Sequence, residues 1–323
     1  MISRREFVAG MAGAGAAAGL GLGPAQAQTV EMLRMFVPAA PGGGWDQTAR
    51  SIEQVLRATN AVNGVQITNV PGAGGAVGLP QFLNNWRGQG NSLMVAGMVM
   101  VGSLIANKSP MRITQTTPIA RLTGEFLALV VPAASPFRTA RDFVDALKAD
   151  ASKVPVAGGS AGGSDHILLG MIAKASGVAA AKASYVAFSG GGPAMAALLG
   201  NQVAAGVSGY GEFAEQVKAG KLRLLAISAD KRQDGIDAPT LKEAGVDVEL
   251  FNWRGVFAPP GVSDADRMAM INMIQKMAAS PQWIEVCKQR DWTPITLAGD
   301  AYKAFLDSES ARIEGILKDL GLA

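Results

Sequence analysis

The sequence predicts an α/β fold with mainly parallel strands, divided into two lobes with a cleft between them. Short apolar runs alternate with helix-length segments, and glycine-rich turns join the two. This alternation is typical of parallel strands that are connected by crossing helices. A single core becomes strained at about 300 residues, so two lobes are expected.

The individual elements follow from the apolar periodicity of each segment. Strands are expected at residues 32–37, 65–69, 93–96, 128–131, 154–157, 204–208, 222–228 and 255–258. Helices are expected at residues 46–58, 139–149, 164–175, 193–199, 264–277 and 301–317. In the helix at 264–277, Met270, Ile271, Ile274 and Met277 have helical spacing and are predicted to face the core.

Two extended segments, 127–136 and 249–260, each end in a turn that contains proline. They predict that the chain crosses between the lobes twice. Lobe 1 is then discontinuous and consists of residues 28–126 and 253–323, and lobe 2 consists of residues 127–252. A cleft between two lobes is a common place for a ligand.

The N-terminus has the pattern of a twin-arginine export signal. Ser3-Arg4-Arg5-Glu6-Phe7 precedes an apolar stretch rich in alanine and glycine, and Ala25-Gln26-Ala27 suits a signal peptidase. Residues 1–27 are therefore predicted to be a signal peptide that is cleaved after Ala27, which would deliver the chain to the periplasm.

Charge and cysteine content exclude several classes of protein. Without Arg4, Arg5 and Glu6 the basic residues fall from 29 to 27 and the acidic ones from 26 to 25, a net charge of +2. No block of like charges suggests nucleic acid as a partner. Cys287 is the single cysteine of the sequence, so no disulfide within the chain can form.

Four glycine-rich turns, each following an apolar strand and opening a helix, are the main functional signal. They lie at residues 41–46, 71–75, 158–164 and 189–193. Glycines let a ligand approach the backbone, and the N–H groups at a helix start favour an anion. No turn ends in Gly-Lys-Ser/Thr, and residues 72–77 lack the third glycine of a dinucleotide fingerprint. We therefore expect a bound carboxylate and no cofactor.

An enzyme is the main alternative, because Gly158-Gly159-Ser160-Ala161-Gly162 matches the G-x-S-x-G nucleophile motif. The only histidine, His166, lies in the helix that follows, whereas a hydrolase takes its histidine from a later loop. Ser164 is interpreted as a helix N-cap. One histidine and one cysteine, far apart in the sequence, also predict no metal site.

Three larger side chains beside the turns allow two interpretations each. Asp46 either orients a ligand through water or serves as a first-turn helix carboxylate. Trp45 either walls the cleft or covers the core of its lobe. Tyr210 either closes over the ligand or is buried in lobe 2.

Four segments resemble the solute-binding proteins of tripartite tricarboxylate transporters, the TctC/Bug-type periplasmic receptors. They are PAAPGGGWDQTAR (38–50), NVPGAGGAVGLPQF (69–82), TTPIARLTGE (116–125) and WRGVFAPPG (253–261). The resemblance implies a type II periplasmic-binding-protein fold. It also implies a carboxylate ligand, delivery to two membrane subunits of a transporter, and no enzymatic activity.

The resemblance places the ligand on the four turns. The candidate contacts on or beside these turns are Ala40, Gly43, Gly44, Trp45, Asp46, Gly74, Ser160, Gly163, Ser164, Ser189, Gly190, Gly191 and Tyr210. Trp45 resembles the citrate-type branch, which favours a tricarboxylate. Phe188-Ser189 stands where many relatives carry tyrosine and lysine, so neutral donors are expected to hold the anion. We expect a monomer, and the alternatives are an exported serine hydrolase that uses Ser160 or a ligand-presenting sensor subunit.

Overall fold

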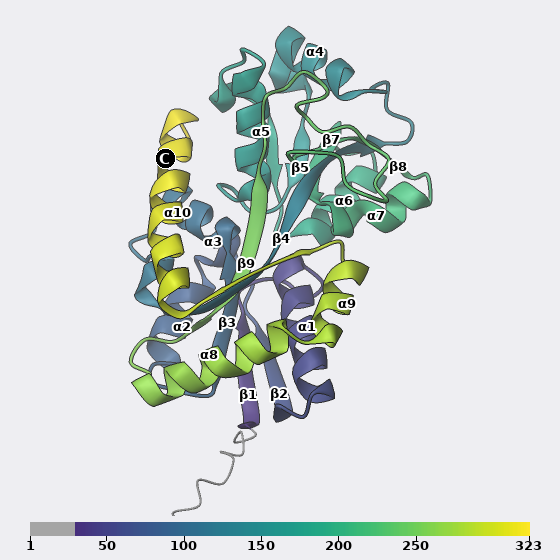
Figure 1. The fold of residues 1–323 in the computed structure, drawn as a ribbon. Coiled ribbons are helices and arrows are strands. Elements are labelled where there is room, and N and C mark those ends of the chain that lie inside the picture. Colours follow the sequence, from purple (N-terminus) through teal and green to yellow (C-terminus); the bar gives the residue numbers. More distant parts are fainter. Residues whose placement is uncertain (1–29) are drawn as a thin grey trace, which may run out of the picture.

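The computed structural model describes residues 30–323, and the predicted export signal with its cleavage after Ala27 lies outside the described residues. Two α/β lobes are stacked along the long axis of the molecule, and two long strands run between them (Figure 1). This is the two-lobed architecture predicted from the sequence.

Lobe 1 is built on a mixed sheet in which β1 is central to a parallel group of three strands. The sheet contains β1 (Val30–Val37), β2 (Val62–Asn69), β3 (Ser92–Gly97), β9 (Phe251–Ala258), the first part of β4 (Thr117–Pro132) and β10 (Thr293–Ala298). The helices of this lobe are α1 (Gly44–Ala58), α2 (Gly78–Asn85), α3 (Met98–Ala106), α8 (Asp264–Ala278), α9 (Pro281–Gln289) and α10 (Gly299–Asp319). The short helices η1 (Ala73–Gly75) and η2 (Ile113–Gln115) complete it.

Lobe 2 repeats the design with a smaller sheet, in which β5 pairs in parallel with both β6 and β7. Its strands are the last part of β4, β5 (Val156–Gly158), β6 (Tyr185–Ala187), β7 (Ala205–Gly209) and β8 (Leu222–Ile227). Its helices are α4 (Ala140–Asp150), α5 (Ser164–Ala175), α6 (Gly191–Leu199) and α7 (Tyr210–Lys218), with η3 (Ala151–Lys153) and η4 (Ala180–Lys182).

Strand β4 belongs to both lobes. Up to Phe126 it pairs with β9, where Phe126 lies opposite Phe251, and from Leu127 it pairs with β7 in the other sheet. This change of partner falls at the predicted boundary between residues 126 and 127, which stays a prediction. The second boundary, between residues 252 and 253, falls inside β9 and remains a proposal.

The parallel pairs lie in the outer parts of the two sheets, whereas β4 and β9 in the centre are antiparallel to their neighbours. A chain that crosses from one lobe to the other and later returns must run in opposite directions at the crossing. Sequence analysis underestimates the length of β4, of which it predicts only residues 128–131. The reason is Pro118, which lies near the start of β4 and argues against a strand. It also gives no signal for β6, which has only three residues, or for the largely exposed β10.

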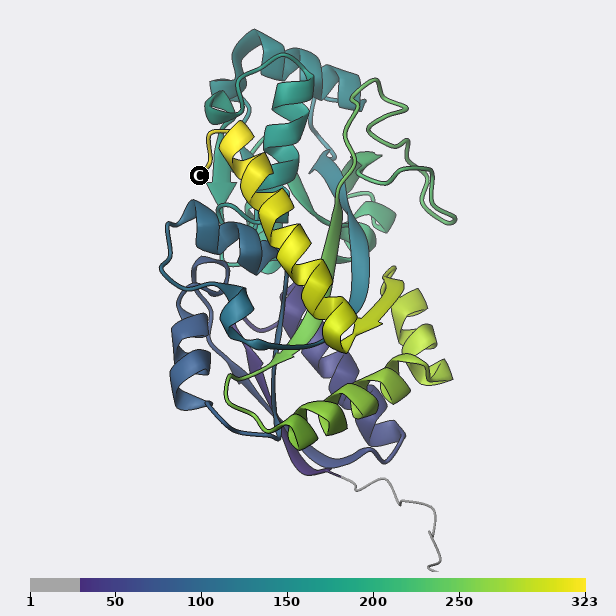
Figure 2. The same cartoon turned by 60° about the vertical axis from the view of Figure 1, so that its left-hand side comes forward.

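The C-terminal helix α10 ties the two lobes together along one side of the molecule (Figure 2). The indole Nε1 of Trp253 in β9 donates to the Glu309 carboxylate at 3.1 Å. Beyond the end of α10, Leu320 lies against Gly170 of α5 in lobe 2. The predicted apolar face of α8 is confirmed as core, since Met270, Ile271, Ile274 and Met277 are all buried. Within residues 30–323 no helix is long and apolar enough to span a membrane.

Tyr302 in α10 offers a test of this packing. Its ring is fully buried against Trp253 and Phe257, and its hydroxyl finds no hydrogen-bond partner among the described residues. Because an unpartnered buried hydroxyl carries a desolvation cost, Tyr302→Phe should leave the free energy of unfolding unchanged or raise it by up to about 1 kcal/mol. Leu306→Ala, also fully buried in α10, should cost about 2–5 kcal/mol in the same urea titrations. A large loss in Tyr302→Phe would mean that the hydroxyl has a partner, such as a buried water.

Candidate ligand-binding cleft

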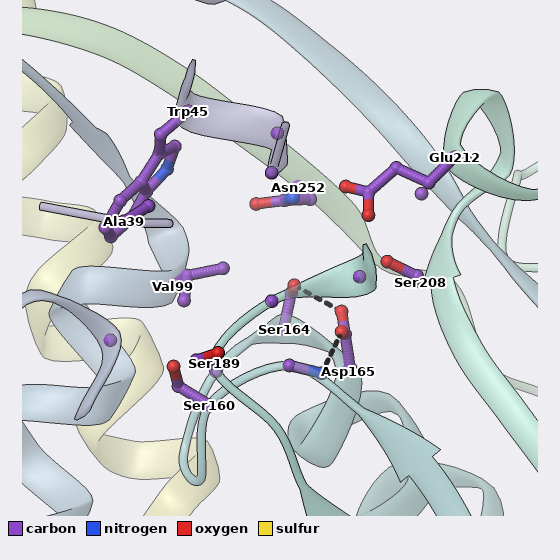
Figure 3. Close-up of a pocket in the computed structure, with 18 of the residues that line it drawn as sticks. Ala39, Trp45, Val99, Ser160, Ser164, Asp165, Ser189, Ser208, Glu212 and Asn252 are labelled. Carbon is purple, nitrogen blue, oxygen red and sulfur yellow. Dashed lines mark hydrogen bonds between the residues drawn. The ribbon is translucent and has the colours of Figure 1, made fainter. Parts of the chain in front are cut away.

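A pocket lies between the lobes, where β4 and β9 pass from one lobe to the other and contribute Glu125, Asn252 and Arg254 to its lining. Trp45 and Ala39 face it from lobe 1, while Ser208 and Glu212 approach it from lobe 2 (Figure 3). The residues that line it are Pro38, Ala39, Gly43, Gly44, Trp45, Gly72, Gly74, Val99, Glu125, Gly159, Ser160, Gly163, Ser164, Asp165, Ser189, Gly190, Gly191, Ser208, Gly209, Glu212, Asn252 and Arg254.

The N-termini of three helices point at this pocket. Helices α1, α5 and α6 begin after the N-cap glycines Gly43, Gly163 and Gly190, none of which supplies a side-chain cap. By contrast, Thr139, Ser263 and Ser280 cap α4, α8 and α9, which begin elsewhere in the fold. The first N–H groups of a helix have no partner within it, so those of α1, α5 and α6 are available to an anion.

Asp46 fixes the first glycine loop. Its carboxylate accepts hydrogen bonds from Gly42 N at 2.9 Å, Arg50 Nε at 2.8 Å and Asn69 Nδ2 at 3.0 Å. Burial would raise its pKa, but these hydrogen bonds outweigh burial and the pKa lies below its usual value. Asp46 therefore shapes the loop as a first-turn carboxylate and does not line the pocket.

The third glycine loop, in lobe 2, is held by three side chains. Asp165 accepts from Gly159 N at 2.8 Å, His166 Nδ1 accepts from Gly162 N at 3.1 Å, and the Tyr185 hydroxyl donates to Gly159 O at 2.8 Å. The Tyr185 ring also stacks on His166, with centroids 4.2 Å apart. The interpretation of Ser164 as the N-cap is wrong: Gly163 holds that position in extended geometry, and the Ser164 hydroxyl instead donates to Asp165.

The two lobes touch around the pocket through glycines. A Cβ added to Gly102 in α3 would lie 2.1 Å from the carbonyl oxygen of Gly162 in lobe 2. A Cβ at Gly74 would likewise lie 3.1 Å from the Ser160 Cβ. A side chain at Gly102 would therefore hold the lobes apart, whereas one at Gly74 would first meet Ser103 of its own lobe, whose Oγ lies 2.1 Å from the added Cβ. The structure therefore has the lobes closed over the pocket.

Four charged side chains form the floor of the pocket, and sequence reasoning missed all of them. Glu125 in β4 and Arg254 in β9 form an ion pair, with side chains 3% and 4% exposed. Glu212 in α7 lies with its Oε1 3.9 Å from Arg254 Nη2, and Asp165 lines the same pocket. The expected neutral site is therefore a charged one. A charged residue inside an apolar strand was the signal that could have identified Glu125 and Arg254 as site residues. Both also lie in the segments that carry the family resemblance.

The carboxylates of this floor are hard to ionise. Burial raises the pKa of Glu212 to about 7, the Glu125 charge adds to that increase, and Arg254 only partly offsets it. Burial also raises the pKa of Asp165 to about 6, against hydrogen bonds from Gly159 and Ser164. The pKa of Glu125 is raised for the same reason, with Arg254 and Asn252 opposing the increase.

The structure brings together ten of the thirteen predicted contact residues. The residues of this group that line the pocket are Gly43, Gly44, Trp45, Gly74, Ser160, Gly163, Ser164, Ser189, Gly190 and Gly191. Trp45 combines both of its interpretations, since it lines the pocket and is only 6% exposed.

Three predicted residues do not line the pocket. Ala40 contributes only its carbonyl, which accepts from Gly43 N at 3.2 Å. Tyr210, the first residue of α7, is buried in the apolar cluster of lobe 2, whereas its neighbour Gly209 lines the pocket. Asp46 is occupied by its own loop, as described above.

His166 is poorly placed to activate Ser160. Its Nδ1 already accepts the Gly162 N–H, so the neutral ring carries its proton on Nε2 and has no lone pair left for a base. Burial lowers the pKa of His166, which favours this neutral form. No three His, Cys, Asp or Glu side chains in the part of the chain that the structure describes are grouped to hold a metal ion.

The fold and the pocket define a two-lobed solute-binding protein. Residues 48–322 match the model of the tripartite tricarboxylate transporter family receptor, and the chain belongs to this family. It is 29% identical to the UPF0065 protein in the gbd 5′ region of Cupriavidus necator, over 100% of this chain and 99% of that protein. It is 26% identical to protein BugT of Bordetella pertussis, over 90% of this chain and 89% of BugT.

Solved structures agree with this assignment. The periplasmic binding protein BugD superposes with a TM-score of 0.81 at 26% identity, covering 90% of this chain and 98% of BugD. MatC from Rhodopseudomonas palustris with bound malate superposes with a TM-score of 0.78 at 23% identity, over 89% of this chain and 99% of MatC, and shows the shared fold.

The raised pKa values predict how stability depends on pH. In the folded state Glu212 keeps its proton up to a pKa of about 7, whereas the unfolded chain loses it near the ordinary glutamate pKa of 4.5. The ligand-free protein should therefore lose stability as the pH rises from about 4.5 to about 7. Glu212→Gln should flatten this dependence by on the order of 2 kcal/mol in urea titrations at several pH values.

The difference between the two proteins is the quantity to measure. His166, with its lowered pKa, gives the opposite dependence in both proteins and cancels in the comparison. Equal pH dependence in Glu212→Gln and the unaltered protein would contradict the assignment of a protonated Glu212.

Proposed function

We propose that this chain is an exported periplasmic solute-binding protein that captures a small carboxylate and catalyses no reaction. The observation that carries the proposal is the convergence of three uncapped helix N-termini, those of α1, α5 and α6, on one closed pocket. Such N-termini favour a carboxylate, and the glycines around them let it reach the backbone N–H groups.

Closure of the lobes would let a partner distinguish the ligand-bound protein from the ligand-free one. A ligand that contacts both lobes favours the closed arrangement, whose surface differs from that of an open one. Family membership supports delivery of the ligand to the membrane subunits of a tripartite tricarboxylate transporter. We infer that the chain acts as a monomer in the periplasm after cleavage of residues 1–27.

The charges in the pocket bear on which carboxylate is bound. Trp45 favours a citrate-like tricarboxylate by its resemblance to that branch of the family, and citrate remains a candidate. However, the three negative charges of citrate would lie beside Glu125, Asp165 and Glu212. The Arg254 guanidinium is the one cation of the pocket lining that could balance them. A ligand with fewer carboxylates experiences less repulsion at this floor.

A thermal-shift screen of residues 28–323 tests the proposal. Its arms are citrate, di- and monocarboxylates, aromatic acids and acidic amino acids. A ligand at 100 times its Kd should add about 2.7 kcal/mol of stability through mass action. Lack of any shift, together with hydrolysis of a model ester that Ser160→Ala abolishes, would replace the binding function by a hydrolase.

Gly163 is the position at which binding and folding can be separated. It caps α5 beside Val99 of lobe 1, where an added Cβ would lie 3.0 Å from Val99 Cγ1 and 2.9 Å from Ser160 O. Gly163→Leu should reduce the affinity for the best ligand of the screen by more than about tenfold, since the side chain obstructs both the loop and closure. Gly315→Leu is the matched control, because a Cβ at Gly315 meets nothing within 4 Å. Unchanged affinity in Gly163→Leu would refute this location of the site.

A further inference from the structure

The pocket has two chemically different ends. One end presents the N-terminus of α5 and the hydroxyls of Ser160 and Ser189, which suit a carboxylate. The other end presents hydrogen-bond acceptors and negative charge, chiefly Glu212 and Asn252 (Figure 3), close to the Glu125–Arg254 pair. A second carboxylate would meet repulsion at this end.

Glu212 has no cation of its own at that end, although the Ser208 hydroxyl donates a hydrogen bond to its carboxylate. Its carboxylate rests against Gly191 at the start of α6, where an added Cβ would lie 1.5 Å from Glu212 Oε2. The nearest cation is Arg254, 3.9 Å away and already paired with Glu125. The Glu212 side chain is 14% exposed, so water compensates for only part of its charge.

Asn252 provides a second, independent sign of a missing donor. Its Nδ2 donates to Glu125 Oε1 at 3.2 Å, which fixes the orientation of the amide. Its Oδ1 is then left buried without a hydrogen-bond partner among residues 30–323, although the residue is only 4% exposed. The Asn252 side chain lies in the pocket between Trp45 and Glu212 (Figure 3). An unpartnered buried acceptor is unfavourable until something donates to it.

Building on the proposed function, we propose that the ligand carries an ammonium group in addition to its carboxylate, and that Glu212 and Asn252 Oδ1 accept the hydrogen bonds of that group. An ammonium brings three donors and one positive charge. It therefore satisfies the unpartnered oxygen and offsets the excess of carboxylates at once. A hydroxyl would satisfy Asn252 but leave the charge unbalanced. The ligand class is that of small amino acids and amino dicarboxylates.

The test uses matched acids that differ at one substituent, measured by isothermal titration calorimetry at pH 7.5. One set is succinate, malate and aspartate, which carry hydrogen, hydroxyl and ammonium at the same carbon. A second set is butanoate and 4-aminobutanoate. In at least one set the ammonium-bearing acid should bind more than about tenfold tighter than its ammonium-free analogue, as expected for charge-assisted hydrogen bonds.

Glu212→Gln should reduce this preference by about tenfold or more, because it keeps the shape of the side chain and removes the charge. Glu215→Gln is the matched control, since Glu215 lies in the same helix with its side chain 84% exposed and paired with Lys218. The comparison of acids on the unaltered protein stands by itself if the variant does not fold.

Proton release gives a second readout. The raised pKa of Glu212 means that it is partly protonated near pH 7 before binding. A bound ammonium favours the ionised form, so binding of the ammonium-bearing acid should release protons. Titration in buffers of different ionisation enthalpy measures this release, which should disappear in Glu212→Gln.

The outcomes separate this inference from the proposed function. Tighter or equal binding of the ammonium-free acids, or an unchanged preference in folded Glu212→Gln, would overturn the ammonium site and leave the carboxylate-binding function in place. Absence of binding by every acid of both sets and of the wider screen would overturn both proposals.

Discussion

The buried ion pair between Glu125 and Arg254 is the constraint on which the rest of the structure depends. It joins β4 and β9, the two antiparallel strands that cross between the lobes, and both side chains are almost fully buried. Removing one partner of such a pair leaves an uncompensated buried charge, at a cost of about 3–5 kcal/mol. Asn252 and Trp292 also surround the pair, through a hydrogen bond and a cation–π contact. The floor of the pocket is therefore fixed by the same contacts that fix the crossing of the chain.

The two lobes build their walls of the pocket in the same way. A glycine loop gives access to the backbone, and a carboxylate early in the following helix fixes the loop from behind. Asp46 serves this purpose in lobe 1 and Asp165 in lobe 2. The loops are rich in glycine, but these hydrogen bonds hold them in place. The helix N-termini therefore stay directed at the pocket. Such preorganisation reduces the entropy lost when a ligand binds.

Charge is distributed unevenly over the pocket. The N-terminus of α5 and the Ser160 hydroxyl on one side favour a carboxylate, whereas Glu212 and the Asn252 oxygen on the other side favour a donor with positive charge. The desolvated carboxylates of Glu125, Asp165 and Glu212 reach the same small volume from β4, α5 and α7. A site built in this way selects its ligand by the arrangement of charge as well as by size.

The sequence by itself determined the α/β class, the two lobes, most of the strands and helices, and the glycine turns that open onto the cleft. These features depend on local rules, namely apolar periodicity, turn chemistry and the behaviour of a helix start. Only the tertiary structure decided that Glu125 and Arg254, 129 positions apart, form one pair beside Glu212 and Asp165. It also decided that Tyr210 is buried and Asp46 is occupied by its own loop. A side chain's charge is visible in the sequence, but its partners and its burial depend on how distant strands cross, and no local pattern encodes that crossing.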